Sequence, residues 1–450
     1  MRLKTHNLAF LGTVWLASFA AVPAFAQSAS TAPALLPAPS GGDEVAAFYT
    51  NYKVQPIWTR AGINDAAVTQ LVAILERSAF DGFAEGPPLA DQVQAAVAQA
   101  RSGDPAATAA AERTLSTAWV RYVQALKRPT PGMIYAYDYL KPQGVRTAQI
   151  LLAAGAAPSL ERYLQDTANL NPLYVDLRDA AWAEARTSGN KTPDPRLLAN
   201  LDRLRSIRAD GRFLIVDSGS QMLSLYQDGR LADSMKVVVG KPELPTPLIA
   251  SIMHYITYNP YWNVPDHLVR KVTAPNVLKS GATYLKRQGY EVMADWTRES
   301  AVIPWQQIDW KSVQAGQTHI RVRQLPGPAN SMGKLKFPFP NGEDIYLHDS
   351  PEREYFARDK RLLSNGCVRV EDARRLGRWL LGQDPAAPEN GPEVQVQLPQ
   401  GVPVYLTYVT AQVKDGKVTY LDDPYGWDLP DRPQIASSGQ ALPAATATQR

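Results

Sequence analysis

The sequence contains very little of two residue types that often carry out catalysis. Only one of its 450 residues is a cysteine, Cys367, and five are histidines. A single cysteine cannot form an internal disulfide, so Cys367 is either a buried, inert thiol or a free, reactive one. His254, His267 and His319 lack the spacing of metal ligands, and we read them as structural or surface residues. We therefore expect neither a metal nor a cofactor.

Strong charge and long apolar runs are also missing. The formal net charge is +4, and Arg2 and Lys4 lie in an N-terminal segment that we expect to be removed. So small a charge gives no reason to expect nucleic-acid binding. Beyond the N-terminal segment, no eighteen consecutive residues are apolar. This predicts that the mature chain is not an integral membrane protein.

The N-terminal segment "MRLKTHNLAFLGTVWLASFAAVPAFAQ" has the pattern of a secretory signal peptide. It has a basic start, an apolar run and the small-residue triplet Ala24-Phe25-Ala26, and we predict cleavage after Ala26. The alternative is an uncleaved membrane anchor. Pro23 and the Ala-x-Ala ending argue against that alternative. The sequence therefore predicts export from the cytoplasm.

Two different periodicities follow along the chain. In "NDAAVTQLVAILERSAFDG", Val68, Leu71, Val72 and Leu75 lie on one face of a helix, and similar helical patterns continue to about residue 209. After that the period changes to two: "RFLIVDSGSQMLSLYQDGRLADSMKVVVG" predicts three strands, with Asp-Gly as a hairpin turn. A long insertion contains the helical stretch "PDHLVRKVTAPNVLKSG", and "VPVYLTYVTAQVKDGKVTYLDDPYGWD" is expected to close the sheet.

The predicted fold class is an α+β multidomain protein, in which an all-α N-terminal domain precedes a mostly β domain with an inserted cap. The predicted segments are a signal peptide at 1–26, an Ala/Pro/Ser linker at 27–42, a helical domain at 43–209, a β domain at 210–408 with a cap at about 264–335, C-terminal strands at 409–430, and a disordered tail at 431–450.

Cys367 and His348 lie within twenty positions of each other, in "IYLHDSPEREYFARDKRLLSNGCVRVEDA". A thiolate nucleophile needs a nearby base, and the histidine could reach the sulfur if the two runs pack side by side. We expect Cys367 to end a turn that starts a helix, whose dipole would favour the thiolate. Gly366 would allow a tight turn with N–H groups facing an oxyanion, and Ser364 could cap that turn or bind substrate. The alternative is that both residues belong to the core.

At these residues the chain resembles the L,D-transpeptidases with a YkuD-type catalytic domain. The family signature is a histidine followed by Ser/Thr-x-Gly-Cys, here "HDS" and "SNGCVRV". The stretches "YNPYWNVP", "RQLPGPANSMGKLKFPFPN" and "YLHDSP" are similar to the capped subgroup typified by the Gram-negative YcbB enzymes. "AAFYTNYKVQPIWT" is similar to the helical scaffold of that subgroup. The resemblance covers most of residues 43–430.

The sequence departs from the family pattern in two places. Asn365 stands where the family usually has a histidine between the serine and the glycine. That position is not the general base, so we expect activity to survive. In addition, only some twenty residues separate "YVDLRDAAW" from "LDRLRSIR". The small peptidoglycan-binding repeat of the subgroup is therefore expected to be absent.

The resemblance implies a peptidoglycan L,D-transpeptidase in the periplasm. Cys367 would attack the meso-diaminopimelate–D-Ala bond of a tetrapeptide stem, release D-Ala and form a thioester. An amine of a second stem would then form a 3→3 cross-link. His348 would be the base, with its other ring nitrogen held by a backbone carbonyl, so that the carboxylate of Asp349 is not needed.

Further site residues are expected around this pair. Tyr346, two residues before the histidine, should face the same side of its strand and could line the site. Arg369 is either a site residue or part of a structural salt bridge. Tyr261, Trp262 and Asn263 of the cap could form a wall of the groove, or they could be ordinary core.

Three other functions remain open at this point. The same acyl-enzyme could be released by water, as in an L,D-carboxypeptidase or hydrolase. It could instead be transferred to an outer-membrane protein or another cell-wall protein. A third possibility is a non-catalytic wall-binding protein, against which the intact cysteine and histidine argue.

Overall fold

The computed structural model describes residues 41–208, 210–297, 299–386 and 391–428. The predicted signal peptide, the C-terminal tail and most of the predicted linker lie outside these residues. Gly41 and Gly42, assigned to the linker, are the first residues of helix α1. Within the described ranges, every helix is too short or too polar to cross a membrane.

The N-terminal part of the described chain is helical, as predicted. Val68, Leu71, Val72 and Leu75 are all buried on one face of α2. Pro105 begins α4, where the side chain of the preceding aspartate accepts N–H bonds from the first turn. The helices are α1 (Gly41–Tyr52), α2 (Asp65–Arg77), α3 (Gly86–Ala100), α4 (Pro105–Leu126), α5 (Thr147–Ala156), α6 (Leu160–Ala168), α7 (Pro172–Ser188) and α8 (Pro195–Leu204).

The second part is mostly β and begins at Arg212. The predicted turn between its second and third strands is present: Asp228 and Gly229 both have positive φ, as a tight hairpin turn requires. The strands and helix of this part are β2 (Arg212–Asp217), β3 (Met222–Gln227), β4 (Arg230–Gly240), β5 (Ile249–Tyr258), β9 (Leu335–Phe337), β10 (Leu347–His348), β11 (Leu362–Ser364), β12 (Val368–Val370), α13 (Ala373–Leu381) and β13 (Val394–Thr407).

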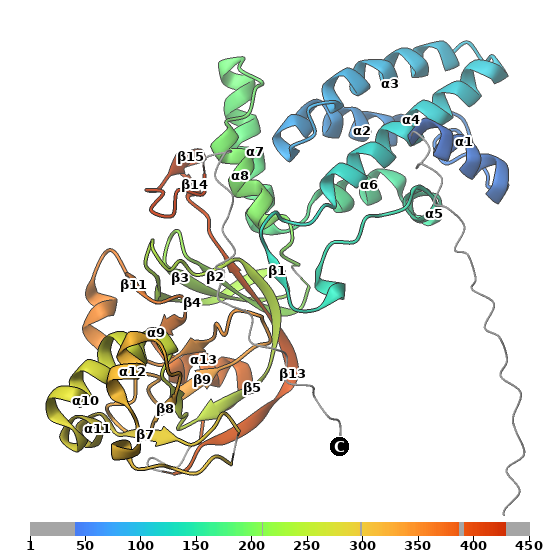
Figure 1. The fold of residues 1–450 in the computed structure, drawn as a ribbon. Coiled ribbons are helices and arrows are strands. Elements are labelled where there is room, and N and C mark those ends of the chain that lie inside the picture. The colour runs from blue at the N-terminus through green and yellow to red at the C-terminus, as the bar shows by residue number, and fades with distance from the viewer. Residues whose placement is uncertain (1–40, 209, 298, 387–390, 429–450) are drawn as a thin grey trace, which may run out of the picture. The chain divides into compact units, whose positions relative to one another are not determined.

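These strands form a closed ring. Their order is β5-β13-β2-β3-β4-β12-β10-β9, and β9 pairs with β5 to complete the circle. One side chain in two points inward, so that Leu214, Val237, Phe337 and Val368 belong to one buried cluster. Helix α13 adds its apolar face to the same cluster. Figure 1 shows β5 and β13 running side by side. The core of the ring thus fixes which side chains of β10 and β12 face outward.

The outer face of part of the ring shares a hydrophobic core with the helices. Phe213, Ile252 and Tyr405 of the strands belong to the same buried cluster as Leu201 and Leu204 of α8. The helical part also contributes a strand, β1 (Ile134–Tyr135), which pairs in parallel with β5. The periodicity gave no sign of this strand. Truncation near residue 204 would therefore expose apolar surface on the strands.

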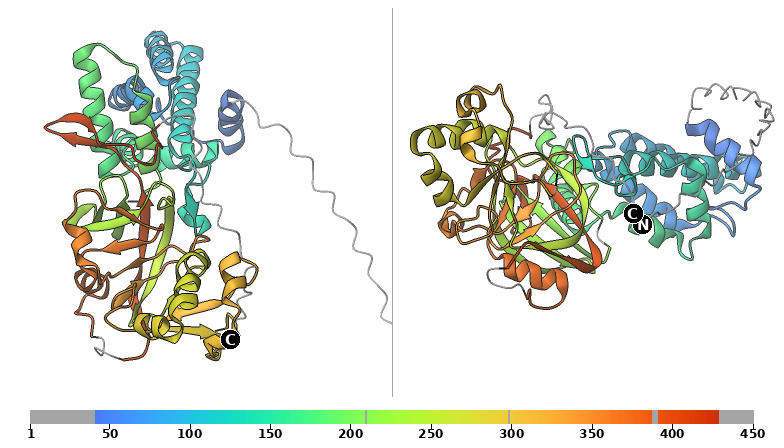
Figure 2. Two further views of the ribbon diagram at one scale, coloured as in Figure 1. Left: turned by 60° about the vertical axis from the view of Figure 1, so that its left-hand side comes forward. Right: turned by 60° about the horizontal axis from the view of Figure 1, so that its bottom comes forward.

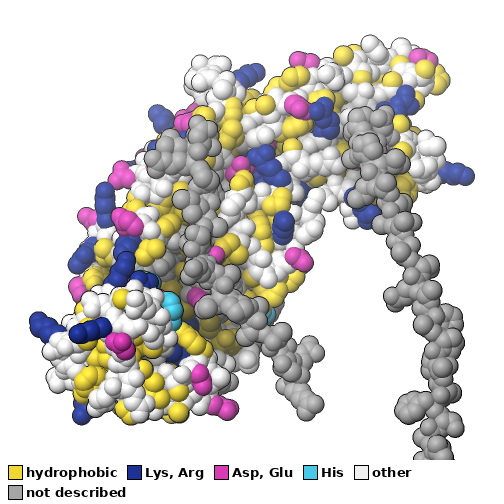
Figure 3. Space-filling view, in the orientation of Figure 1, with side chains coloured by type: hydrophobic (Ala, Val, Ile, Leu, Met, Phe, Trp, Pro, Cys, Tyr) yellow, Lys and Arg dark blue, Asp and Glu magenta, His cyan; other side chains and the backbone are white. Residues whose placement is uncertain are grey.

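The cap is inserted between β5 and β9 and has its own small core. Its elements are β6 (Trp262–Asn263), α9 (Asp266–Leu268), a π-helical turn (Val269–Thr273), α10 (Ala274–Ser280), α11 (Ala282–Gln288), β7 (Tyr290–Met293), α12 (Trp310–Ala315) and β8 (Arg321–Gln324). Its strands form a separate sheet in the order β6-β8-β7. Figure 3 shows lysine and arginine side chains on the surface where Figure 1 places the cap. Exposed basic residues there include Lys271, Lys279, Lys286 and Arg287.

The end of the described chain corrects one prediction. We expected the run that includes residues 411–420 to close the sheet. Only β13 joins the ring, whereas β14 (Ala411–Lys414) and β15 (Lys417–Tyr420) form a separate hairpin. Figure 2 shows this hairpin beside α7, with which both of its strands are in contact. The ring is completed by the β5–β9 pairing instead.

Candidate active site

Cys367 lies between two short strands rather than before a helix. It follows β11 and directly precedes β12, and α13 begins six residues later with Asp372 as its N-cap. The expectation that a helix dipole stabilises the thiolate is therefore wrong. The physical reason is that Val368–Val370 continue into the ring, because their apolar side chains fill its core.

The turn before Cys367 is held by Ser364 and Gly366. The buried Ser364 hydroxyl donates to the Cys367 carbonyl oxygen at 2.6 Å and accepts from the Gly366 N–H at 3.2 Å. Ser364 thus caps the turn, one of the two roles expected for it. Gly366 has φ +115°, and a Cβ there would lie 3.0 Å from Ile345. Its N–H bonds within the turn, which argues against the oxyanion role expected for that group. Asn365 is exposed.

The register of the strands brings His348 next to this turn. β10 pairs with β12 in parallel, with Leu347 opposite Val368 and His348 opposite Arg369. The two runs do lie side by side, as the hypothesis of a Cys–His pair requires. The His348 side chain is buried, and its Nδ1 lies 2.6 Å from the carbonyl oxygen of Asp349. Because a carbonyl accepts, Nδ1 carries the proton and Nε2 is left as an acceptor.

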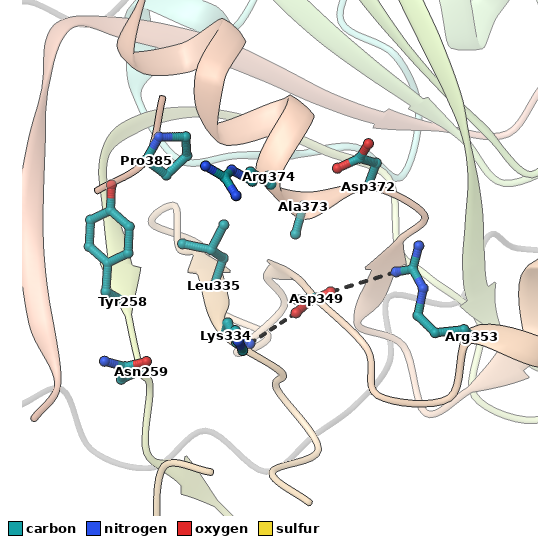
Figure 4. A pocket seen from close by; sticks show the side chains of 10 residues that line it. All are labelled: Tyr258, Asn259, Lys334, Leu335, Asp349, Arg353, Asp372, Ala373, Arg374 and Pro385. Atoms are coloured by element: carbon teal, nitrogen blue, oxygen red, sulfur yellow. Dashed lines mark hydrogen bonds and ion pairs between the residues drawn. The ribbon is translucent and has the colours of Figure 1, made fainter. Parts of the chain in front are cut away.

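The carboxylate of Asp349 contacts residues other than the histidine. It lines a cavity of about 410 Å³, together with Lys334 and Arg353. Figure 4 shows the carboxylate between these two residues: it accepts from the Lys334 backbone N–H at 3.0 Å and lies 3.8 Å from the Arg353 guanidinium. Gly333 has a positive φ at this close approach. Only the carbonyl of Asp349 therefore orients His348, as predicted.

The thiol of Cys367 is half-buried and is surrounded by the segment before His348. Its Sγ lies 3.7 Å from the Asp344 carbonyl oxygen. Burial raises the pKa of the thiol to about 11, while hydrogen bonds from the backbone and hydroxyl of Tyr346 and the charge of Lys336 act in the opposite direction. At neutral pH the thiol is therefore protonated in the resting protein.

His348 is also neutral in the resting protein. Burial lowers its pKa to about 3, and the charges of Arg369 and Lys336 add to that effect, while the bond to Asp349 opposes it. Among the described residues, the thiol and the imidazole each bond to other groups and not to each other. Hydrogen bonds at a catalytic site often tighten only when substrate binds. The resting site therefore contains a neutral thiol and a neutral imidazole, and not a thiolate–imidazolium ion pair.

These pKa directions predict how Cys367 reacts with iodoacetamide, which requires the thiolate. Because the pKa of the thiol is raised, the thiolate fraction should increase about tenfold per pH unit from pH 7 to 9, without a plateau. The measurement is the rate of mass increase of the protein, which reports on Cys367 alone because the chain has no other cysteine. A plateau below pH 8 would mean that an ion pair exists before substrate binds.

The other predicted site residues have different surroundings. Tyr346 faces the site, with its ring centroid 6.1 Å from that of His348. Arg369 forms an ion pair with Glu352 at 2.9 Å. Its contacts are therefore those of a structural salt bridge, one of the two roles expected for it. Trp262 packs in the cap, with its ring 6.4 Å from that of Tyr290. Its contacts are those of the cap core.

Sequence reasoning missed Lys336, whose ammonium lies 3.8 Å from the centre of the Tyr346 ring. A lysine between apolar residues in "KLKFPFPN" indicates an outward-facing position on a strand. It does not indicate which residue lies on the neighbouring strand. The described residues contain no group of three or more His, Cys, Asp or Glu side chains arranged to hold a metal ion.

Comparison with family models assigns both parts of the chain. Residues 211–405 match the YkuD family, the L,D-transpeptidase catalytic domain. Residues 43–180 match the scaffold domain family. The chain therefore combines a scaffold domain with a YkuD-type L,D-transpeptidase catalytic domain. This confirms the resemblance and the predicted fold class.

One curated protein and two solved structures are also similar to this chain. A Haemophilus influenzae protein named "Putative L,D-transpeptidase" is 27% identical over 394 residues, which are 85% of this chain and 78% of that protein. Two solved structures are less similar, and the matched region covers 50% and 58% of their chains. They are the Ldtfm–avibactam carbamoyl enzyme (14% identity, 45% of this chain and 50% of that chain, TM-score 0.22) and an L,D-transpeptidase from Mycobacterium smegmatis (12% identity, 44% and 58%, TM-score 0.23).

Proposed function

We propose that the protein is a peptidoglycan L,D-transpeptidase that forms 3→3 cross-links between meso-diaminopimelate residues through a thioester on Cys367. The observation that carries this proposal is the placement of the lone cysteine beside a buried, oriented histidine within a YkuD-type domain. The family match supports acyl transfer, and a cysteine with a neighbouring base is a nucleophile suited to it.

In the first half-reaction, the sulfur of Cys367 bonds to the carbonyl carbon between meso-diaminopimelate and the terminal D-Ala. The thiol proton passes to Nε2 of His348, and from there to the D-Ala nitrogen as the C–N bond breaks. The backbone N–H of Cys367, for which the described residues offer no acceptor, is the group we assign to the developing oxyanion. D-Ala then leaves and a thioester remains.

In the second half-reaction, the side-chain amine of an acceptor stem attacks the thioester carbonyl. The amine loses a proton to Nε2 of His348, the C–S bond breaks, and the proton returns to the sulfur. The Nδ1–H bond to the Asp349 carbonyl keeps the imidazole in the tautomer that both steps need. We further propose that the cap limits the access of water, which would favour an amine as acceptor.

The proposed location is outside the cytoplasmic membrane, in the periplasm, because the substrate is the cell wall and the chain begins with a predicted signal peptide. The proposed partners are the tetrapeptide stems of peptidoglycan. Hydrolysis of the acyl-enzyme and transfer to an outer-membrane protein are the alternatives to a cross-link.

Mass spectrometry of the products tests the proposal. Purified disaccharide tetrapeptides are incubated with the enzyme, and we expect release of D-Ala and a dimer linked between two diaminopimelate residues. Tripeptides alone would identify a carboxypeptidase. Unchanged stems, with transfer only when a protein acceptor is added, would identify a protein-attaching enzyme. Neither of these results is compatible with the proposed cross-linking activity.

A further inference from the structure

Three charged or titratable side chains form a row across neighbouring strands of the ring. Lys336 of β9 pairs with His348 of β10, which pairs with Arg369 of β12. Laterally paired residues extend from the same face of a sheet. The residues beside them in sequence, such as Leu347 and Val368, fill the core. His348 is thus flanked by two cations on the outer face of the ring.

The two cations differ in how their charge is balanced. Arg369 lies 2.9 Å from the Glu352 carboxylate and over the ring of Tyr355. Lys336 is half-buried, and within the described part of the chain no carboxylate lies at ion-pair distance from it. Its ammonium lies over the ring of Tyr346 at 3.8 Å. A cation–π contact offsets only part of the cost of removing an ammonium from water.

The aromatic ring below Lys336 also contacts the thiol. Tyr346 interacts with Cys367 through its backbone and its hydroxyl. The ammonium, the ring and the sulfur are therefore consecutive neighbours. An incompletely balanced cation close to a nucleophile is a feature that functional sites retain despite its cost.

We propose that Lys336 is an electrostatic positioning residue: held over Tyr346, its ammonium stabilises negative charge on the Cys367 sulfur and disfavours protonation of His348. A neutral imidazole is the form that can accept the thiol proton. Burial of the site disfavours the thiolate form of the sulfur. The positive charge of Lys336 favours the thiolate and so offsets part of that effect when the sulfur attacks. The inference rests on the proposed role of Cys367.

Charged and titratable groups on neighbouring segments act on the thiol, the lysine and the imidazole. Cys367 faces Tyr346, Lys336 and Asp344. The charges of Cys367, Glu393 and Asp344 raise the pKa of Lys336, but its burial outweighs them and lowers it. His348 faces Arg369 and Lys336. Removal of the lysine charge should therefore raise the pKa of the thiol and the pKa of the imidazole.

The test uses Lys336→Met, which keeps most of the side-chain volume, and Lys336→Arg, which keeps the charge. The control is Lys360→Met, since Lys360 is exposed and pairs with Asp422 at 3.0 Å. Loss of an opposite charge raises a thiol pKa by about one unit, and higher intrinsic nucleophilicity offsets part of the lower thiolate fraction. We expect iodoacetamide to alkylate the Met variant about threefold more slowly from pH 7 to 9.

Two further results are expected from the same variants. The Arg variant and the Lys360 control should react within twofold of the wild type. By NMR, the pKa of His348 should rise by about one unit in the Met variant, an effect that a purely structural lysine would not produce. Wild-type alkylation rates in the Met variant, or equal losses in the Met and Arg variants, would overturn the proposal.

A measurement on the wild type alone covers the case in which the variants do not fold. A cation beside the sulfur should make anionic iodoacetate react faster, relative to neutral iodoacetamide, than it does with free cysteine. A ratio no higher than that of free cysteine would overturn the proposal. These rates do not depend on turnover. If Cys367→Ala kept cross-linking activity, the proposed function would fail while the effect of Lys336 on alkylation could still be observed.

Discussion

Replacement of Cys367 by alanine should abolish the release of D-Ala from tetrapeptide stems. The chain contains no other thiol, so no second residue can form the thioester. The fold should survive, because the side chain is half-buried at a turn that Ser364 and Gly366 hold. We expect a loss of stability of about 1 kcal/mol or less. Product analysis and thermal unfolding measure the two effects.

Cys367→Ser is the matched variant for this prediction. It keeps the shape of the side chain but replaces the thiol with a hydroxyl, a far weaker nucleophile at this site. A carbapenem, a β-lactam whose strained amide can acylate a nucleophilic thiol, should form a covalent adduct with the wild type only, as measured by mass spectrometry of the intact protein. An adduct on the alanine variant, or normal turnover without the thiol, would exclude Cys367 as the nucleophile.

Much of the ring could be predicted because its strands follow local rules. Alternating apolar residues predicted β2, β3 and β4, and the Asp228–Gly229 turn joined two of them. The apolar face of α13 also follows from helical spacing, because Ala373, Leu376 and Leu380 lie three and four residues apart. Each of these signals lies within about ten residues of sequence. Physically, they reflect side chains that must enter one core regardless of which strand pairs with which.

The closure of the ring could not be predicted in the same way. It depends on the pairing of β5 with β9, whose strands are separated by the whole cap. The two-residue strand β1 is another example: it lies within the helical part, and no periodicity can be read from Ile134 and Tyr135. Non-local pairing is determined by the energy of the assembled core and not by local pattern.

This shared core also bears on the role of the scaffold domain. A chain starting near Leu204 would test whether Cys367 stays reactive without the scaffold domain. In the structure, Arg203 donates to Asp428 at 2.8 Å in a buried ion pair, and Leu204 belongs to the core beneath Phe213 and Tyr405. Removing the helices would break the ion pair and take away the helical side of this core. We therefore expect such a truncated chain to fold poorly, so that its loss of activity would be structural.

The candidate site was predictable in its two principal residues and not in its electrostatics. The motifs around His348 and Cys367 are short and specific. Lys336 and Arg369 flank the histidine only because three strands adopt one register. A shift of one residue on any strand would turn those charges to the other face. Sequence spacing alone therefore suggested an activated pair, whereas the folded site keeps both partners neutral at rest.

Replacement of His348 by glutamine should slow acylation of Cys367 by about 10²–10⁴-fold, the usual contribution of a positioned base. Glutamine fits a buried site of this size, and its amide N–H can still donate to the Asp349 carbonyl, which His348 contacts at 2.6 Å. It cannot accept the thiol proton. The measurement is the rate at which the carbapenem adduct accumulates. His254→Gln and His319→Gln are the matched controls.

The controls differ from His348 in what they contact. His254 is exposed and bonds to the Tyr137 hydroxyl, and His319 forms an exposed pair with Asp266. Both variants should acylate at close to the wild-type rate. If His319→Gln were as damaging as His348→Gln, the assignment of the base would be wrong.

The pH dependence distinguishes a missing base from a distorted site. With His348 present, acylation between pH 6 and 9 should change little, because the imidazole and the thiol keep one protonation state in that range. Without it, attack depends on the small thiolate fraction, which increases about tenfold per pH unit below a raised thiol pKa. The deficit of His348→Gln should therefore shrink as the pH rises. A deficit that stays constant from pH 6 to 9 would mean that the substitution acts through geometry, since hydroxide cannot replace a misplaced side chain.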